Sequence, residues 1–332
     1  MNRQILLKSR PAGMPTPGNF EAVEAPMPAP GDAGVLRRTL FLSLDPYMRG
    51  RMSDAPSYAP PVAVGGVMCG HTVSEVVESR DPAFRPGDIV AGYDGWQQYA
   101  AGPGKDLRKI DPAAAPVSTA IGVLGMPGFT AYVGLYDIGQ PKAGETVVVS
   151  AASGAVGSVV GQLAKTRGCR AVGVAGSDDK CRFVVADLGF DACVNYKTAD
   201  LRGALADACP SGVDVYFDNV GGAVLAAALR ILNRGARIPL CGMISEYNAT
   251  ETQPGPNLRP LLVSRAMIKG FIVSDHTDRA MAFHQEVAPL VKSGRIKFKE
   301  DIVDGLENAP SAFIGLLEGK NFGKLLIRVA KP

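Results

Sequence analysis

The chain has 332 residues, of which 46% are hydrophobic and 20% charged, and its formal net charge is +3. This length allows two ordinary domains with cores of their own, and the composition is that of a folded globular protein. A small net charge without a block of Lys or Arg argues against nucleic acid or an anionic membrane surface as a partner. Apolar runs all fall short of the roughly 18 residues of a membrane helix.

The six cysteines contain no C-x-x-C pair, and the amino-terminal residues MNRQILLKSRPAG lack the apolar core of a secretory signal. These two observations predict reduced thiols and a cytoplasmic protein.

Residues 1–120 are rich in Pro and Gly, with short β-like runs at 34–44, 66–78 and 88–91. Turn clusters separate these runs, which predicts an all-β domain. The last segment, 294–332, returns to short strands at 297–303 and 324–329. We expect it to rejoin the first domain.

Between them, residues 121–293 alternate strand and helix patterns. Strands are expected at 145–150, 170–175, 192–195, 213–218, 236–241 and 267–273. Helices are expected at 155–168, 178–188, 200–208, 221–233 and 278–293. Such alternation with short links predicts an α/β fold with a doubly wound parallel sheet.

The first strand of that sheet leads into a small-residue turn, ASGAVG at 152–157. It matches the G-x-G-x-x-G fingerprint with Ala152 in the first glycine position. Gly154 would let the backbone approach a pyrophosphate, and Gly157 would let the helix pack closely on the strand. The helix amino end would add N–H groups and a positive dipole. The alternative is an ordinary tight turn, but its place at the opening of the sheet favours a dinucleotide.

The second strand indicates which dinucleotide binds. An NAD site usually has Asp or Glu at the tip of this strand, whereas here the strand ends in Gly176 and Ser177. Ser177, Lys180 and Tyr196 offer a cation and hydroxyl donors to a 2′-phosphate. The sequence therefore favours NADPH over NADH, with Asp178 and Asp179 interpreted as helix-capping acids.

Ordered motifs run through the whole chain: LSLDPYMRGRM (42–52), VLGMPGFTAY (123–132), AASGAVG (151–157), FDNVGG (217–222), CGMISEYN (241–248), GFIV (270–273) and GKNFGK (319–324). With them the chain resembles the medium-chain dehydrogenase/reductase superfamily. Within it, the match is to the zinc-free double-bond reductases that include leukotriene B4 dehydrogenase/prostaglandin reductase. Among these it looks most like the bacterial NADPH-dependent curcumin/dihydrocurcumin reductases.

The resemblance implies a GroES-like β-barrel domain, a Rossmann domain for NADPH and a homodimer. It also implies roles for individual residues. Lys180 and Tyr196 would hold the adenosine phosphate, and Asn219 would lie by the adenosine ribose. The remaining cofactor residues would be Ser153, Gly154, Ala155, Val156, Gly157 and Ser177 around the phosphates, and Cys241, Gly242, Met243, Ile244, Ser245, Tyr247, Phe271, Ile272, Val273 and Asn321 around the nicotinamide half.

Some of these residues have plainer interpretations. Lys180 is also compatible with a solvated helix position, Tyr196 with a strand-end aromatic, and Asn219 with the start of a turn. Cys241 is interpreted first as a small buried residue, because the sequence places nothing basic next to it that would lower its thiol pKa.

Zinc-dependent relatives take ligands from an early Cys, from the His of a Gly-His-Glu segment and from a later Cys. Here Gly70 and His71 are followed by Thr72, no Cys precedes Cys69, and the four-cysteine cluster of a structural zinc is absent. Because a catalytic zinc needs three protein ligands, the sequence predicts no metal. His71 is expected to be packed or hydrogen-bonded.

The cofactor must then carry the chemistry, with hydride transfer to the β-carbon of an enone. The resulting enolate oxygen needs hydrogen-bond donors. Tyr47 is the candidate catalytic donor, with packing against the substrate as its alternative role, and Tyr247 is a second candidate. An apolar wall for a flat conjugated substrate is expected from Met126, Tyr58 and Trp96.

The expected function is therefore reduction of curcumin-like α,β-unsaturated ketones or aldehydes by a zinc-independent enzyme. Several relatives carry a substrate-binding Tyr in the segment 261–265, where this chain has Val263, and so a prostaglandin-like substrate range is in doubt. The alternatives are an NADPH:quinone reductase on the same fold and a non-catalytic NADPH-binding sensor.

Overall fold

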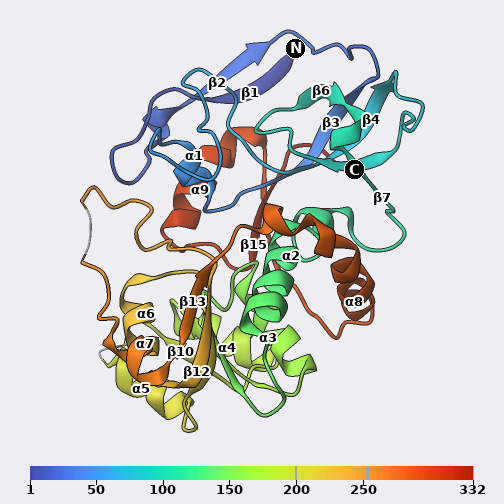
Figure 1. Cartoon of the computed structure of the whole chain (residues 1–332). Coiled ribbons are helices and arrows are strands. Elements are labelled where there is room, and N and C mark those ends of the chain that lie inside the picture. Colours follow the sequence, from blue (N-terminus) through green and yellow to red (C-terminus); the bar gives the residue numbers. More distant parts are fainter. Residues whose placement is uncertain (199, 252–253, 332) are drawn as a thin grey trace. The chain divides into compact units, whose positions relative to one another are not determined.

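The computed structural model describes residues 1–198, 200–251 and 254–331, and the chain divides into two compact units (Figure 1). The first unit comprises Met1–Gly122 and Glu300–Pro332, and the second comprises Val123–Lys299. The boundaries expected from the sequence, 120/121 and 293/294, lie a few residues away from these.

The second unit is built on a six-stranded sheet in which every pairing is parallel. Its strands are β8 (Thr146–Ser150), β9 (Arg170–Ala175), β10 (Ala192–Asn195), β11 (Val213–Phe217), β12 (Leu232–Leu240) and β13 (Met267–Gly270). They lie in the order β10-β9-β8-β11-β12-β13. This order reverses between β8 and β11, as in doubly wound dinucleotide-binding sheets, and it confirms the fold class expected from the sequence.

Helices cover both faces of this sheet (Figure 1). They are α2 (Met126–Val133), α3 (Gly157–Thr166), α4 (Asp178–Ala186), α5 (Leu201–Ala208), α6 (Gly222–Leu229), α7 (Arg259–Ser264) and α8 (Ala280–Lys292). Alternate residues of β8 point to opposite faces: Val147 and Val149 belong to one core and Val148 to the other. Because both sides of this strand are covered, its residues form a continuous apolar run, and this run allowed β8 to be predicted from the sequence.

Two helices of the second unit differ from the expectation. The helix expected at 278–293 follows β13, and the connection between β12 and β13 contains α7, which the sequence analysis missed. That helix has only six residues, starts with a proline in its first turn and exposes Leu262 and Val263, so it carries no clear apolar period. The second missed element is α2, which continues into a π-helical segment, Gly134–Gly139.

The first unit contains a two-stranded antiparallel ribbon, β1 (Asn2–Leu7) with β2 (Phe20–Ala25), and a seven-stranded sheet. The sheet path is β14-β15-β3-β4-β5-β7, and β6 pairs with β3. These strands are β3 (Gly34–Ser43), β4 (Thr72–Ser79), β5 (Ile89–Gly92), β6 (Tyr99–Pro103), β7 (Arg108–Ile110), β14 (Glu300–Asp304) and β15 (Lys324–Arg328).

The carboxyl-terminal segment joins the first unit, because β15 pairs antiparallel with β3 and parallel with β14. Between β14 and β15 lies α9 (Ala309–Leu317), which the sequence analysis did not predict. The unit also has a short helix, α1 (Met48–Arg51), after β3. Short 3-10 segments of the two units are Pro17–Asn19, Gly104–Asp106, Val117–Ile121, Val273–Arg279 and Leu306–Asn308. In the part of the chain that the structure describes, each helix is too short or too polar to cross a membrane.

Candidate active site

The turn after β8 is tight and leads directly into α3. Its left-handed residue is Ala151 (φ 52°), one position before the substituted fingerprint residue, and Ala152 is fully buried. Ala152 therefore avoids the positive φ that would strain an alanine. The Gly154 N–H donates to the Ala151 carbonyl (2.9 Å), which closes the turn before α3.

Gly157 is required by the packing of α3 on this turn. A Cβ at Gly157 would clash with the Ala151 carbonyl and come within 3.0 Å of the Ala152 Cα atom. At Gly154 a Cβ would come within 3.1 Å of the same carbonyl oxygen. Backbone atoms cannot move aside as a flexible side chain does, so Gly157 needs to be glycine, whereas a Cβ at Gly154 would require only a small shift of the turn.

The residues assigned to the cofactor in the second unit follow the carboxyl ends of all six strands. The glycine turn follows β8, Ser177 follows β9, Tyr196 follows β10, Asn219 follows β11, the loop at 241–247 follows β12, and Phe271 follows β13. Carboxyl ends of parallel strands meet at one edge of the sheet. The fold therefore brings together, at the edge where such sheets bind nucleotides, residues that are up to 120 positions apart in sequence.

Asp218 organises the centre of this edge, at the point where the strand order reverses. It is fully buried, and its Oδ1 accepts from the Tyr216 hydroxyl (2.8 Å), the Ser150 hydroxyl (3.1 Å) and the backbone N–H of Gly221 (2.9 Å). The Asn219 side-chain amide donates to the Ser150 carbonyl oxygen (2.8 Å). These bonds tie the carboxyl end of β8 to that of β11 and fix the position of Asn219.

The tip of β9 carries no carboxylate, as expected from the sequence. Ser177 caps α4, since its hydroxyl accepts from the Lys180 backbone N–H (3.3 Å). Tyr196 is 44% exposed, and a Cβ at Gly176 would come within 3.0 Å of its ring. The Asp178 carboxylate accepts from the Asn195 side-chain amide (2.8 Å). These contacts hold the start of α4 against the end of β10.

The loop at 241–247 packs on the segment after β11. The Cys241 N–H donates to the Asp218 carbonyl (2.8 Å), and the Ser245 hydroxyl donates to the Val220 carbonyl (2.6 Å). The Met243 N–H donates to the Tyr247 hydroxyl (3.4 Å). Burial, aided by the negative charge of Asp218, raises the pKa of the Cys241 thiol to about 12. This agrees with the interpretation of Cys241 as a small buried residue that is not a nucleophile.

Phe271 packs edge-on against Phe217, with 6.2 Å between the ring centroids, and Ile272 and Val273 follow it into a 3-10 segment. Asn321, also assigned to the cofactor, lies in the first unit, where its side-chain amide donates to the Gly323 carbonyl (2.8 Å).

In the first unit, Tyr47 stands at the start of α1 among buried polar groups. Its hydroxyl donates to the Tyr93 hydroxyl at 3.4 Å. Burial, with the nearby charge of Asp45, raises the Tyr47 pKa well above its ordinary value, so the phenol stays protonated. Asp45 is itself paired with the buried Lys324 (Nζ to Oδ1, 2.9 Å) and accepts from the Ser43 hydroxyl.

Three residues close to Tyr47 were not assigned to the site by sequence. They are Tyr93, Cys69 and Arg51. Burial raises the pKa of the Cys69 thiol, and hydrogen bonds from Tyr93 and Arg51 oppose this effect only in part. The Nε and Nη1 atoms of Arg51 are buried and donate no hydrogen bond to any described residue. Because Arg51 is one helical turn after Tyr47, its place in the LSLDPYMRGRM motif is the sequence signal that points to it.

His71 packs edge-on against Tyr93, with ring centroids 4.8 Å apart. Burial lowers the His71 pKa; the charge of Lys324 adds to this effect and that of Asp45 opposes it. His71 is thus a packed, neutral imidazole, as the sequence suggested. Across the described residues, no group of three or more His, Cys, Asp or Glu side chains is placed to hold a metal ion.

One assignment to the substrate wall needs correction. Trp96 has no exposed surface: it stacks on Phe20 (ring centroids 5.6 Å apart) and meets Phe313 edge-on (5.8 Å) in the core of the first unit. It is a core residue because its ring packs against those of Phe20 and Phe313, away from solvent. Tyr58 is 60% exposed, and Met126 is the half-buried first residue of α2.

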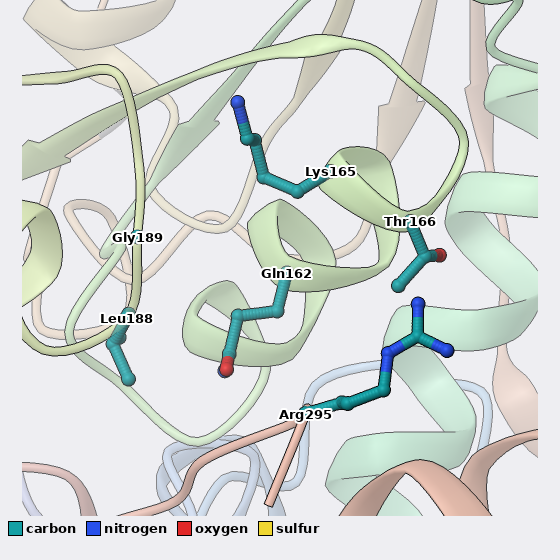
Figure 2. A pocket seen from close by; sticks show the side chains of 6 residues that line it. All are labelled: Gln162, Lys165, Thr166, Leu188, Gly189 and Arg295. Atoms are coloured by element: carbon teal, nitrogen blue, oxygen red, sulfur yellow. The ribbon is translucent and has the colours of Figure 1, made fainter.

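A surface pocket of about 270 Å³ lies elsewhere on the second unit (Figure 2). Figure 2 shows that Gln162, Lys165 and Thr166 line it from the carboxyl-terminal half of α3, opposite Leu188, Gly189 and Arg295. The Gln162 amide is already bonded to the backbone of Lys297, and Lys165 pairs with Asp191 (2.8 Å). This pocket is at the other end of α3 from the glycine turn and is not the cofactor site.

Two family descriptions match the chain. "N-terminal domain of oxidoreductase" matches residues 3–110, and "Zinc-binding dehydrogenase" matches residues 155–292. The residues present do not fit the zinc that the second description names, because Thr72 follows His71 and no ligand group is formed by the described residues.

Known proteins match the chain over its whole length. The NADPH-dependent curcumin reductase of Escherichia coli is 55% identical, over 99% of this chain and 97% of that protein. The 2-alkenal reductase (NADP(+)-dependent) of Nicotiana tabacum is 43% identical, over 99% of this chain and 98% of that protein. The crystal structure of CurA from Vibrio vulnificus in complex with NADPH matches with a TM-score of 0.96 and 50% identity, over 99% of this chain and 100% of that chain. The chain therefore belongs to the medium-chain dehydrogenase/reductase family, in its group of NADPH-dependent double-bond reductases.

Proposed function

We propose that this protein is an enzyme that reduces the C=C bond of α,β-unsaturated ketones and aldehydes with NADPH. The observation that carries the proposal is the end-to-end similarity, at 55% identity, to a relative named NADPH-dependent curcumin reductase. The similarity to a 2-alkenal reductase extends the substrate class from ketones to aldehydes. No step assigned below requires a metal.

The cofactor lies along the carboxyl edge of the second unit's sheet. Residues 153–157 take the pyrophosphate, and Ser177, Lys180 and Tyr196 take the 2′-phosphate. Asn219 takes the adenosine ribose. In the second unit, the nicotinamide half would be held by Cys241, Gly242, Met243, Ile244, Ser245, Tyr247, Phe271, Ile272 and Val273. When bound, NADPH supplies the hydride that is added to the substrate β-carbon.

Tyr47 donates a hydrogen bond to the substrate carbonyl oxygen, where negative charge develops as the double bond is reduced. The phenol is neutral over the whole physiological range, as tyrosine normally is, so it carries a proton to donate. Without substrate this proton is donated to the Tyr93 hydroxyl; on binding, the Tyr47 hydroxyl turns to the carbonyl oxygen and accepts from Tyr93, and the positive charge of Arg51 favours the developing enolate. In the first unit, Tyr58 would add apolar contact for a flat conjugated substrate. In the second unit, Met126 and Tyr247 would do the same.

We also propose that the protein is a homodimer and that it is cytoplasmic. The outermost strand of the second unit, β13, has four exposed residues, among them Met267 (44% exposed) and Ile268 (39%). An exposed apolar strand edge is a template for pairing with a second copy. All six cysteines are free thiols, which supports a reducing compartment.

The test is to mix the purified protein with NADPH and one acceptor at a time, a conjugated enone, a 2-alkenal or a quinone, and to follow the loss of reduced nicotinamide absorbance. We expect oxidation of NADPH with the enone and the alkenal, and a product heavier by two hydrogen atoms in the mass spectrum. Turnover with the quinone alone would identify a quinone reductase. Tight NADPH binding without turnover on any acceptor would identify a sensor.

A further inference from the structure

Two cysteine sulfur atoms lie in contact where α4 begins and β10 ends. The Sγ atom of Cys193 is 2.9 Å from the Sγ atom of Cys181. Cys181 is in the first turn of α4, next to Lys180, and Cys193 is on β10, three residues before Tyr196. Both cysteines are partly buried free thiols.

The environments of the two thiols differ in the way that a reactive pair requires. The Cys193 thiol donates its hydrogen bond to the Cys181 sulfur, and this bond lowers the Cys181 pKa although burial opposes it. The same hydrogen bond, together with burial, raises the pKa of Cys193. Cys181 is therefore the nucleophile of the pair, because the thiolate is the reactive form, and Cys193 is the resolving thiol.

We propose that Cys181 and Cys193 form a reversible disulfide on reaction with hydrogen peroxide, and that this bond weakens NADPH binding. The effect on binding rests on the cofactor site proposed above, whereas bond formation does not.

The chemistry balances with peroxide as the oxidant. The Cys181 thiolate attacks one peroxide oxygen, an S–O bond forms, the O–O bond breaks and the leaving hydroxide takes a proton to become water. The Cys193 sulfur then attacks the Cys181 sulfenic acid, an S–S bond forms and the S–O bond breaks with release of a second water. Two thiols are oxidised and one peroxide is reduced to two waters. A dithiol then reduces the disulfide back to the two thiols by exchange and is itself oxidised.

The geometry couples this bond to the 2′-phosphate site. A disulfide needs the two sulfurs to be about 0.9 Å closer than they are, since an S–S bond is about 2.05 Å long. The Cys193 sulfur lies against Gly173 of β9, 3.2 Å from the place that a Cβ there would take. The new bond ties the first turn of α4 to β10, and the segments that it joins carry Lys180, next to Cys181, and Tyr196, three residues after Cys193.

The experiment treats the full-length protein with hydrogen peroxide, blocks the remaining thiols with iodoacetamide and maps the peptides by mass spectrometry. NADPH dissociation constants are measured before and after treatment and again after dithiothreitol. We expect a linked 181–193 peptide, NADPH binding that is weaker by about fivefold or more, and full recovery with dithiothreitol. Cys181→Ser should abolish both effects, and the control Cys209→Ser, at a buried thiol far along the chain, should retain both.

The outcomes separate the parts of the proposal. Absence of the linked peptide would overturn it, and a linked peptide with unchanged NADPH binding would overturn the coupling. Failure of the reduced protein to bind NADPH would overturn the cofactor site and the coupling with it, while the mass measurement still decides whether the bond forms.

Discussion

The Tyr47 hydroxyl donates a hydrogen bond of 3.4 Å to the Tyr93 hydroxyl, and burial raises the pKa of both phenols. The negative charge of Asp45 adds to the rise in the Tyr47 pKa but not to that of Tyr93, so the two tyrosines are not equivalent. The pair combines one phenol that is half-buried with another that is 46% exposed.

Replacing Tyr47 by Phe should lower kcat for an enone by about 100-fold, because a donor to the developing oxyanion is lost. The NADPH dissociation constant should not change. Tyr93→Phe is the matched control and should cost about fivefold, the effect of one neutral hydrogen bond of about 1 kcal/mol. Steady-state kinetics and fluorescence titration measure both. Equal losses of kcat in the two variants would contradict the assignment of Tyr47 as the direct donor.

Replacing Lys180 by Ala should weaken NADPH binding by about tenfold or more and leave NADH binding nearly unchanged, because only NADPH carries the 2′-phosphate. Titration with each cofactor measures the two affinities. Lys165→Ala is the control. It removes a lysine in the last turn of α3 that pairs with Asp191, and it should alter neither affinity. A similar loss for both cofactors in the Lys180 variant would rule out the phosphate contact.

Replacing Gly157 by Ala should destabilise the protein by about 1–3 kcal/mol, because the new Cβ would force the Ala151 backbone away from α3. NADPH affinity should fall in the same variant. Chemical denaturation of the apoprotein measures the first effect without reference to the cofactor. Gly31→Ala adds a Cβ that meets nothing within 4 Å and should leave stability unchanged. An unaltered denaturation midpoint for Gly157→Ala would show that the turn has room to move.

The buried neutral His71 should make stability sensitive to acid. Its pKa in the folded protein lies below the ordinary value of 6.5. Just below that pH, the unfolded chain therefore binds a proton at this residue that the folded protein does not bind. The stabilisation is present above pH 6.5 and is lost as the pH falls below it. The groups that face this imidazole are Asp45, Lys324 and Tyr93.

The melting temperature of the wild type should therefore fall more steeply below pH 6.5 than that of His71→Asn. Thermal melts at several pH values measure this slope. His276→Asn, in the second unit, serves as the control for general acid effects and should retain the wild-type slope. Parallel curves for wild type and His71→Asn would contradict the prediction.

Replacing Ile268 by Lys should convert the proposed dimer to a monomer, because a charge on the edge strand opposes pairing. Light scattering coupled to gel filtration measures the mass. Met281→Lys, at a residue that is 72% exposed on α8, adds the same charge away from the strand edge and should leave the dimer intact. A monomeric wild type would refute the proposed assembly.

The parallel sheet could be predicted from sequence because its central strands are short apolar runs between turn residues. The buried β8, with Val147, Val148 and Val149, is the clearest case. The glycine turn was identifiable for the same reason, since Gly157 is required by contacts only a few residues away.

Features that depend on distant contacts could not be predicted. Trp96 was assigned to a substrate wall, but its position is decided by Phe20 and Phe313, which are 76 residues before it and 217 after it. The surroundings of Tyr47 have the same cause, because Tyr93 and Lys324 come from other strands and loops. Helix α7 was missed since its apolar residues are exposed, so that no amphipathic pattern arises.

The position of β15 determines when the first unit can be completed during synthesis. This strand pairs with β3, yet it is made from residues 324–328, which are synthesised long after β3. Its Leu325 and Ile327, together with Phe313 of α9, supply part of the core that encloses Trp96. The second unit, continuous from 123 to 299, is finished earlier and needs none of these residues for its own sheet. A nascent chain thus carries an open β3 edge until these residues are made, and a stop before residue 324 leaves that edge exposed to aggregation.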